Sequence, residues 1–411
     1  MTAAARVPLA DHRADAIALL APLLRAQLRR LGPASAGRIA ADDRHARVDV
    51  PACDNSQMDG FAVRAADLGA VGEDVALPVG PMIAAGDAPS ELPPGTARPI
   101  MTGAPVPEGA DLVVPIEEAV AGGFAAERVT LRPAAVEPGR FVRRRGSDIA
   151  RRDTVLRAGD ALTPARIAHL ASAGVCDVAV VEPVRTVVLS TGSEVADPAQ
   201  ALPPGGVYDA NGPGLAAALA AAGADVIAVG RVPDDPRALL DLLTEHARAG
   251  AELVVTSGGV SAGAVEVVRL AAELPGVSLA FPTVAMQPGG PQGIGTVTID
   301  GHRLAWLAFP GNPVSALVSC ELFARPALEA PPRLRLRLPV RLADPAVPEP
   351  SPAALAQYRR GFVMASGAVR LVGGPSSHLL GALATANALV VVPEGVDAIR
   401  DGDVLETILL T

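Results

Sequence analysis

The clearest absence from this sequence of 411 residues is lysine, because all 35 basic side chains are arginine. Schiff-base enzymes, P-loop nucleotide hydrolases and protein kinases need a lysine amine at a fixed place, so those mechanisms are excluded. Aromatic residues make up only 2% of the chain, although 50% of it is hydrophobic. Its cores must therefore be filled mainly by alanine, valine and leucine.

Paired cysteines and long apolar runs are also lacking. Cys53, Cys176 and Cys320 lie far apart and form no C-x-x-C pair, which argues against a disulfide framework and against a zinc site. No apolar run is long enough to span a bilayer, and the N-terminal residues lack the layout of a secretory signal. A net charge of −9 disfavours nucleic acid as a partner. We therefore expect a soluble, cytoplasmic protein with no nucleic-acid or membrane partner.

The length and the local patterns predict two to four domains. Apolar residues at helical spacing predict a helix over residues 13–31, with Pro22 as a kink or an early-turn residue. Over residues 48–141, short β-like runs alternate with glycine and proline turns, which is typical of a small β-rich domain. A short helix is then expected to begin after a Thr163 cap, with Pro164 in its first position.

From Arg185 onwards, continuous apolar strands alternate with helical segments, one of which is expected to have Asn211 as its cap and Gly223 at its end. This alternation predicts an α/β domain whose parallel sheet is covered by helices on both faces. From about Arg333 the pattern becomes β-like again. A small C-terminal β domain is therefore expected.

Three loops follow strands of this sheet, at the edge where open α/β sheets bind ligands: Ser190–Glu194, Thr256–Gly263 and Phe309–Ala316. The second loop offers successive glycine amides and hydroxyl groups to an anion. Its expected ligand contacts are Thr256, Ser257, Gly258, Gly259 and Ser261. Each loop alone suits an ordinary tight turn, but three at neighbouring strand ends predict a site for an anionic ligand.

Three carboxylates border the same loops: Glu194, Asp209 and Glu266. Hard oxygen ligands of this kind suit Mg²⁺ bridged to phosphate better than they suit zinc. Two alternatives stay open at this point. Asp209 could support a helix N-terminus, and Glu266 could be solvated on a helix.

Polar groups are also concentrated in the β-rich region, above all in DNSQMDGFAVR (residues 54–64). Asp59 and Gly60 by themselves suit a hairpin turn, which leaves the polar residues before them unexplained. A second polar segment covers residues 100–111, and RRRGSDI closes the region with Asp148.

In chain order, these segments resemble the molybdopterin molybdenumtransferase family, the MoeA-type enzymes of molybdenum cofactor synthesis, and the related domain of gephyrin. The segments that carry the resemblance are DNSQMDGFAVR, IMTGAPVPEGADLVVPIEE, RRRGSDI, STGSEV, YDANG, TSGGVSAG, FPGNPVSALV and SSHLLGALATANALVVVPEG. The resemblance covers nearly the whole chain from about residue 10. It implies a homodimer of four-part, multidomain α/β plus β subunits. Their parts would be a split N-terminal domain (1–50 and 142–182), an inserted β domain (51–141), a Mog-like three-layer α/β domain with a parallel-rich sheet (183–330) and a C-terminal β-barrel (331–411).

The resemblance also implies the reaction, in which adenylyl-molybdopterin and molybdate, with Mg²⁺, give molybdenum cofactor and AMP. The implied catalytic residues are Asp59, Asp148, Glu194, Asp209 and Glu266, with Glu194 and Asp209 as metal ligands. Substrate contacts implied beyond the glycine loop are Thr102, Gln287, Pro310, Asn312, Ser315, Arg360 and Ser377. The DNSQMDG loop of one subunit would complete the pocket of the other. A Mog-type adenylyltransferase and recipient molybdoenzymes are the further partners implied.

The sequence departs from the family pattern at QPGGP, where Gln287 and Gly290 stand in place of two lysines. Glu266 and Arg269 replace an aspartate and a lysine, and both changes keep the charge. The two missing cations leave an alternative open, a non-catalytic relative that binds molybdopterin or its nucleotide as a carrier or assembly partner. A nucleotide-sugar enzyme, or another phosphoryl enzyme on the same sheet, would rest on fold analogy alone.

Overall fold

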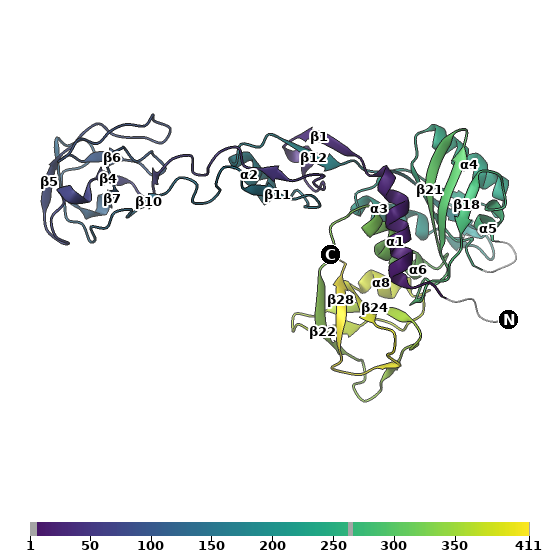
Figure 1. Cartoon of the computed structure of the whole chain (residues 1–411). Helices are drawn as coiled ribbons and strands as arrows, with labels where there is room; N and C mark the ends of the chain where they lie inside the picture. Colours follow the sequence, from purple (N-terminus) through teal and green to yellow (C-terminus); the bar gives the residue numbers. More distant parts are fainter. Residues whose placement is uncertain (1–5, 262–265, 411) are drawn as a thin grey trace. The chain divides into compact units, whose positions relative to one another are not determined.

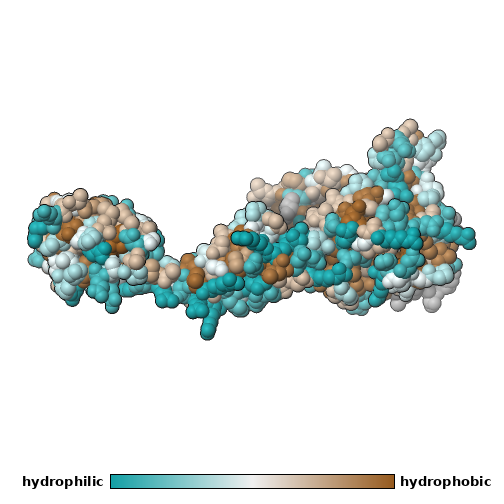
Figure 2. Space-filling view, turned by 90° about the horizontal axis from the view of Figure 1, so that it is seen from above, coloured by the Kyte–Doolittle hydropathy of each residue, from teal (hydrophilic) through white to brown (hydrophobic). Residues whose placement is uncertain are grey.

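The computed structural model describes residues 6–261 and 266–410. The chain forms two compact units, and each is considered by itself: unit 1 comprises Met1–Gln27 and Val181–Thr411, and unit 2 comprises Leu28–Val180. Among the described residues, no helix combines the length and the apolar character needed to cross a membrane. On the face seen in Figure 2, hydrophobic residues are scattered among hydrophilic ones, as is usual for a protein surface.

Unit 1 contains a six-stranded sheet in the order β16-β13-β17-β21-β20-β18. Its strands are β13 (Arg185–Thr191), β16 (Asp225–Val232), β17 (Leu253–Ser257), β18 (Val277–Ala280), β20 (Gly293–Ile299) and β21 (His302–Phe309). The first four strands in that order run parallel, whereas β20 and β18 join antiparallel. The expected parallel-rich sheet is confirmed.

Helices cover both faces of this sheet because successive strand residues point to opposite sides. Val188 and Val255 belong to one core, while Val187 and Val254 belong to the other. The helices of the first core are α1 (Leu9–Leu20), α3 (Asn211–Ala221) and α6 (Pro313–Ser319). Those of the second are α4 (Pro236–Arg248) and α5 (Val267–Ala271), drawn beside β18 and β21 in Figure 1. The three-layer α/β architecture is thereby confirmed.

The C-terminal part of unit 1 is a closed barrel, drawn in yellow and light green in Figure 1. Its strands are β22 (Arg335–Arg341), β24 (Ala356–Val363), β25 (Val369–Leu371), β26 (Ala388–Val392) and β28 (Val404–Leu409). They pair in the order β24-β25-β22-β28-β26, and β26 returns to β24. The short strand β19 (Met286–Gln287) adds to β24 from outside this ring, and helix α8 (Leu380–Thr385) lies beside β24. This confirms the expected C-terminal β-barrel.

Unit 2 is built from small antiparallel sheets. One three-stranded sheet consists of β6 (Arg98–Ile100), β4 (Gly60–Val63) and β7 (Leu112–Pro115), and the other of β5 (Val75–Pro78), β9 (Arg128–Leu131) and β8 (Ala119–Ala121). The two-stranded pairs are β3 (Asn55–Ser56) with β10 (Val142–Arg143), β2 (Arg44–His45) with β11 (Thr154–Leu156), and β1 (Ala26–Arg30) with β12 (Asp177–Val181). Helix α2 (Pro164–Ser172) starts as expected, because the Thr163 hydroxyl accepts a hydrogen bond from the Arg166 amide.

Two local expectations were wrong. The helix predicted over residues 13–31 ends at Leu20, and a 3₁₀ turn with Pro22 leads into the strand β1. Pro22 has no amide hydrogen to continue the helix, so the apolar residues after it take an extended course. Asn211 is the first residue of α3 and not its cap. The capping oxygen is Oδ1 of Asp209, which accepts from the Gly212 amide.

Candidate functional site at the carboxyl ends of the parallel strands

A cavity of about 610 Å³ opens where β13, β17 and β21 end. Ser190 and Thr191 end β13, Ser257 ends β17, and the segment 311–313 follows β21. This is the edge at which doubly wound sheets bind ligands. The predicted residues that line the cavity are Glu194, Asp209, Ser257, Gly258, Gly259, Ser261, Glu266 and Asn312.

Two glycines shape the floor of this cavity. Gly258 has a φ of 98°, and a Cβ there would lie 2.7 Å from Oγ1 of Thr191, so only glycine lets the two loops meet. Its amide, however, donates to the Phe309 carbonyl at 2.9 Å and is not available to an anion. The expectation of two successive ligand-facing amides is therefore wrong for Gly258. Among the described residues no acceptor is found for the Gly259 amide.

Asp209 is the most firmly held of the acidic residues. Its Oδ1 accepts from the Ser190 hydroxyl at 2.8 Å and from the Gly212 amide at 2.9 Å. These bonds fix the carboxylate between the end of β13 and the start of α3. The residue thus supports a helix N-terminus and also lines the cavity, while its role as a metal ligand stays a prediction.

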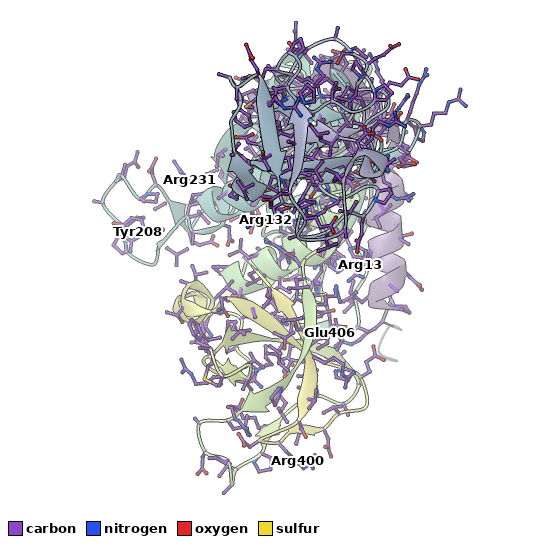
Figure 3. All side chains as sticks on the ribbon, turned by 90° about the vertical axis from the view of Figure 1, so that its left-hand side faces the viewer. Arg13, Arg132, Tyr208, Arg231, Arg400 and Glu406 are labelled. Carbon is purple, nitrogen blue, oxygen red and sulfur yellow. The ribbon has the colours of Figure 1, made fainter. Side chains whose placement is uncertain are left out.

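Several lining residues were missed as site residues in the sequence, among them Asp234, Asn211 and Tyr208. Asp234 accepts from the Ser193 amide at 3.0 Å, and it follows the parallel strand β16, where the strand-end rule would have found it. Asn211 donates to the Gly311 carbonyl at 2.7 Å, while its own Oδ1 is buried without a hydrogen-bond partner among the described residues. Tyr208, labelled in Figure 3, comes from the short strand β15 (Val207–Tyr208).

The charged side chains among the described lining residues of the cavity are all acidic. Four carboxylates line it, from Glu194, Asp209, Asp234 and Glu266, and no basic residue is among the described lining residues. A phosphate ligand would be repelled here unless a divalent cation bridged it to the carboxylates. Nowhere in residues 6–261 and 266–410 do three or more His, Cys, Asp or Glu side chains gather as metal ligands. The carboxylates of the cavity nevertheless fit Mg²⁺, because this ion commonly takes only one or two carboxylates together with substrate phosphates.

Known protein families match most of this chain. Family models match in chain order: the MoeA N-terminal region (domain I and II) over 7–174, the probable molybdopterin binding domain over 187–330 and the MoeA C-terminal region (domain IV) over 343–410. The chain is 42% identical over 393 residues to molybdopterin molybdenumtransferase 2 of Mycobacterium tuberculosis, which covers 91% of this chain and 93% of that protein. The chain belongs to the molybdopterin molybdenumtransferase family.

Other relatives agree with this assignment. The molybdopterin molybdenumtransferase of Synechococcus elongatus is 34% identical over 374 residues, 90% of this chain and 91% of that protein. A crystal structure of a molybdopterin biosynthesis MoeA protein from Pyrococcus horikoshii is 25% identical, with a TM-score of 0.79 over 98% of this chain and 100% of that one. The expected family and fold class are confirmed.

Two expected substrate contacts, Thr256 and Pro310, are not among the described residues that line the cavity. Thr256 is fully buried, and its hydroxyl accepts from Nε1 of Trp306 at 3.0 Å. The carbonyl of Pro310 accepts a hydrogen bond from the Ser257 hydroxyl at 3.3 Å. Both residues hold strand ends in place, and their contact with substrate stays a prediction.

The expected oxyanion contacts Ser315, Arg360 and Ser377 gather around the start of α6. The Val314 amide donates to the Ser377 carbonyl at 3.4 Å, and Ser315 is buried in the helix. Arg360 is also buried, and its guanidinium donates to the Ser376 carbonyl at 3.0 Å and to a second carbonyl of the same loop. The arginine therefore braces the loop that carries Ser377.

The QPGGP segment reaches the same area through β19. Oε1 of Gln287 accepts from Nε2 of Gln357 at 2.9 Å. The φ angle of Gly290 lies outside the left-handed region. A Cβ at this position would lie 3.4 Å from a guanidinium nitrogen of Arg6. A different cation therefore stands beside the position of one missing lysine. Arg269 stands where the family pattern has a lysine. It donates to the Val260 carbonyl, and its guanidinium lies over the Phe281 ring.

The remaining expected residues belong to unit 2. Oδ1 of Asp59 accepts from the amide and the hydroxyl of Thr102 at 2.6 and 2.7 Å, and these bonds hold the pKa of Asp59 below its usual value. Gly60 is the first residue of β4, which pairs with β6 and β7 and not with the preceding strand β3, and a Cβ there would come within 2.2 Å of the Val114 carbonyl. The hairpin-turn alternative is therefore wrong. Asp148 is exposed.

Proposed function

We propose that this chain is a molybdopterin molybdenumtransferase that joins molybdenum from molybdate to the dithiolene sulfurs of adenylyl-molybdopterin and releases AMP. The observation that carries the proposal is the acidic cavity at the strand ends, in a domain that matches a probable molybdopterin binding domain. A nucleotide joined to a pterin phosphate supplies the anionic groups, and the site supplies carboxylates for a bridging cation.

We assign the roles from the contacts within the cavity. Ser190 and the Gly212 amide hold the Asp209 carboxylate in one orientation, so it needs no rearrangement when substrate arrives. Asn211 lines the cavity and holds the Gly311 carbonyl, which fixes the loop after β21 beside the start of α3. Glu194 and Asp209 would hold Mg²⁺. When bound, the metal would neutralise the charge that develops as the link to AMP breaks.

We further propose a homodimer in which the DNSQMDG loop of a second subunit completes the cavity. Asp59 and Thr102 form a fixed polar pair that their own unit leaves exposed, which supports a role toward another molecule. Subunits carrying Asp59→Asn, mixed with subunits carrying Glu194→Gln, should recover activity, because some mixed dimers would hold one intact site. No recovery under conditions where the subunits exchange would contradict the shared site.

The direct test is AMP release from adenylyl-molybdopterin with molybdate, with and without Mg²⁺. Release that depends on both molybdate and Mg²⁺ is expected. A second candidate, a carrier that binds the pterin without turnover, is favoured by Gln287 and Gly290, which remove two expected cations. Stable binding of the pterin nucleotide with no AMP release at any molybdate concentration would establish the carrier and overturn the transferase.

A further inference from the structure

A second cavity of unit 1, of about 250 Å³, shares no lining residue with the cavity at the strand ends. It lies among α1, the π-helical segment Cys320–Ala324 with α7 (Arg325–Ala327), and the barrel strands β22 and β28. Four arginines line it: Arg13, Arg325, Arg333 and Arg335. Figure 3 labels Arg13 on the pale purple helix and Glu406 on a barrel strand.

Positive charge dominates this cavity, whereas the chain as a whole carries −9. Glu321 accepts from Arg333 at 3.0 Å, and Glu406 pairs with Arg335. Counting the four arginines against these two glutamates leaves a net charge of +2. The cavity is therefore the electrostatic opposite of the one at the strand ends.

Two of the arginines have donors that the protein leaves unmatched. Nε of Arg325 is buried without a hydrogen bond among the described residues, and Oε1 of Glu321 lies 3.6 Å away. Burial, and next the charge of Arg333, lower the pKa of Arg325, and the nearby Glu321, which Arg325 shares with Arg333, only partly offsets them. Arg13 donates to the Leu322 carbonyl at 3.1 Å, and no carboxylate within the described parts of the chain pairs with it.

We propose that this cavity binds a small organic anion through one carboxylate or phosphate group held by Arg13 and Arg325. Guanidinium groups present paired N–H donors that match both kinds of oxyanion. The other side of the cavity is apolar, formed by Leu322, Pro326, Ala330, Pro331, Pro332 and Ile408. A volume just below that of typical drug-sized sites suits an anion with a single ring or a short chain. The site is independent of the proposed transferase reaction.

Phenyl phosphate, benzoate and inorganic phosphate are suitable probes for calorimetric titration of the full-length protein. Phenyl phosphate or benzoate should bind, and the tighter of the two identifies the favoured head group. Inorganic phosphate should bind more weakly than phenyl phosphate because it leaves the apolar side uncovered. Replacing Arg13 by Gln should weaken binding of the tighter probe about tenfold or more, since charge-assisted bonds are lost.

Arg337→Gln is the matched control, because Arg337 lies exposed on the same strand as Arg335 but outside the cavity. Ser257→Ala tests whether the probe binds at the strand ends instead. Neither change should alter the affinity. The proposal is overturned if neither organic probe binds, if Arg13→Gln and Arg337→Gln weaken binding equally, or if only Ser257→Ala weakens it.

Discussion

The cavity at the strand ends and the area around the start of α6 were both expected to bind substrate, and they use their polar groups differently. In the cavity, Glu194, Asp234 and Glu266 face open space, and Asp209 is held beside them. Around α6, Arg360 and Gln287 bond to neighbouring carbonyl and amide groups of the protein. Motif residues gather in both places, but among the described residues only the cavity has motif carboxylates, those of Glu194 and Glu266, for which no side-chain hydrogen bond is found. Substitutions in the cavity should therefore change activity, and substitutions around the start of α6 should change stability.

The largest effect is expected from Asp209→Asn. Asparagine keeps an oxygen that can accept from Ser190 and Gly212, so the fold should persist while the negative charge is lost. AMP release should fall about 1000-fold, equivalent to roughly 4 kcal/mol of activation free energy. Glu194→Gln should be comparable, and Glu266→Gln much milder.

AMP release at saturating Mg²⁺ measures this ranking, with thermal unfolding as the control for folding. Glu266 precedes the short helix α5 and no bond of its side chain is seen among the described residues, so its loss should be compensated more easily. A Glu266→Gln protein more impaired than the Asp209→Asn protein would show that the acidic cavity is organised differently.

His12 is a buried, titratable side chain that lies outside the cavity at the strand ends. It packs edge-on against Phe323, and burial lowers its pKa from 6.5 to about 4. The unfolded chain therefore binds more protons than the folded one between these pH values. Stability is fully present above pH 6.5 and is lost as the pH falls toward 4, by about 2 kcal/mol at pH 5 and up to about 3 kcal/mol below pH 4.

Urea unfolding of wild type and His12→Phe at pH 7 and pH 5 measures this loss. The variant should lose less stability than wild type on acidification, whereas exposed His302→Gln should behave as wild type. Equal acid sensitivity of wild type and His12→Phe would mean that His12 does not titrate in the folded state as expected.

Arg360→Met should lower stability rather than change chemistry. It removes the donors that hold the loop before Ser377 and leaves partly buried carbonyls without partners, at a cost of about 2 kcal/mol. Exposed Arg370→Met, on the neighbouring strand β25, is the control. Unchanged unfolding together with a raised molybdate requirement would instead support the family-derived role of Arg360 as an oxyanion contact.

The sequence predicted the sheet and a small C-terminal β domain because their strands carry continuous or alternating apolar residues, whereas the barrel was implied by the family resemblance. It also placed Asp209, Ser257 and Glu266 at one edge, since parallel strands share their carboxyl ends. It could not show that the Gly258 amide donates a hydrogen bond to the Phe309 carbonyl, because that bond joins segments about fifty residues apart. The arginine cavity was equally hidden, as α1 meets the start of the barrel only in the folded chain.

The smallest effect is expected from Gln287→Lys. A lysine near a bound oxyanion adds a charge-assisted bond, which is worth about tenfold in affinity. Here the new amine would also replace the oxygen that accepts from Gln357, and Gln357 in turn lies beside the buried guanidinium group of Arg359. The molybdate concentration for half-maximal AMP release should therefore fall by only about threefold, with Gln287→Met as the uncharged control. A tenfold or larger gain would show that this area does bind the oxyanion, and that its polar groups rearrange to do so.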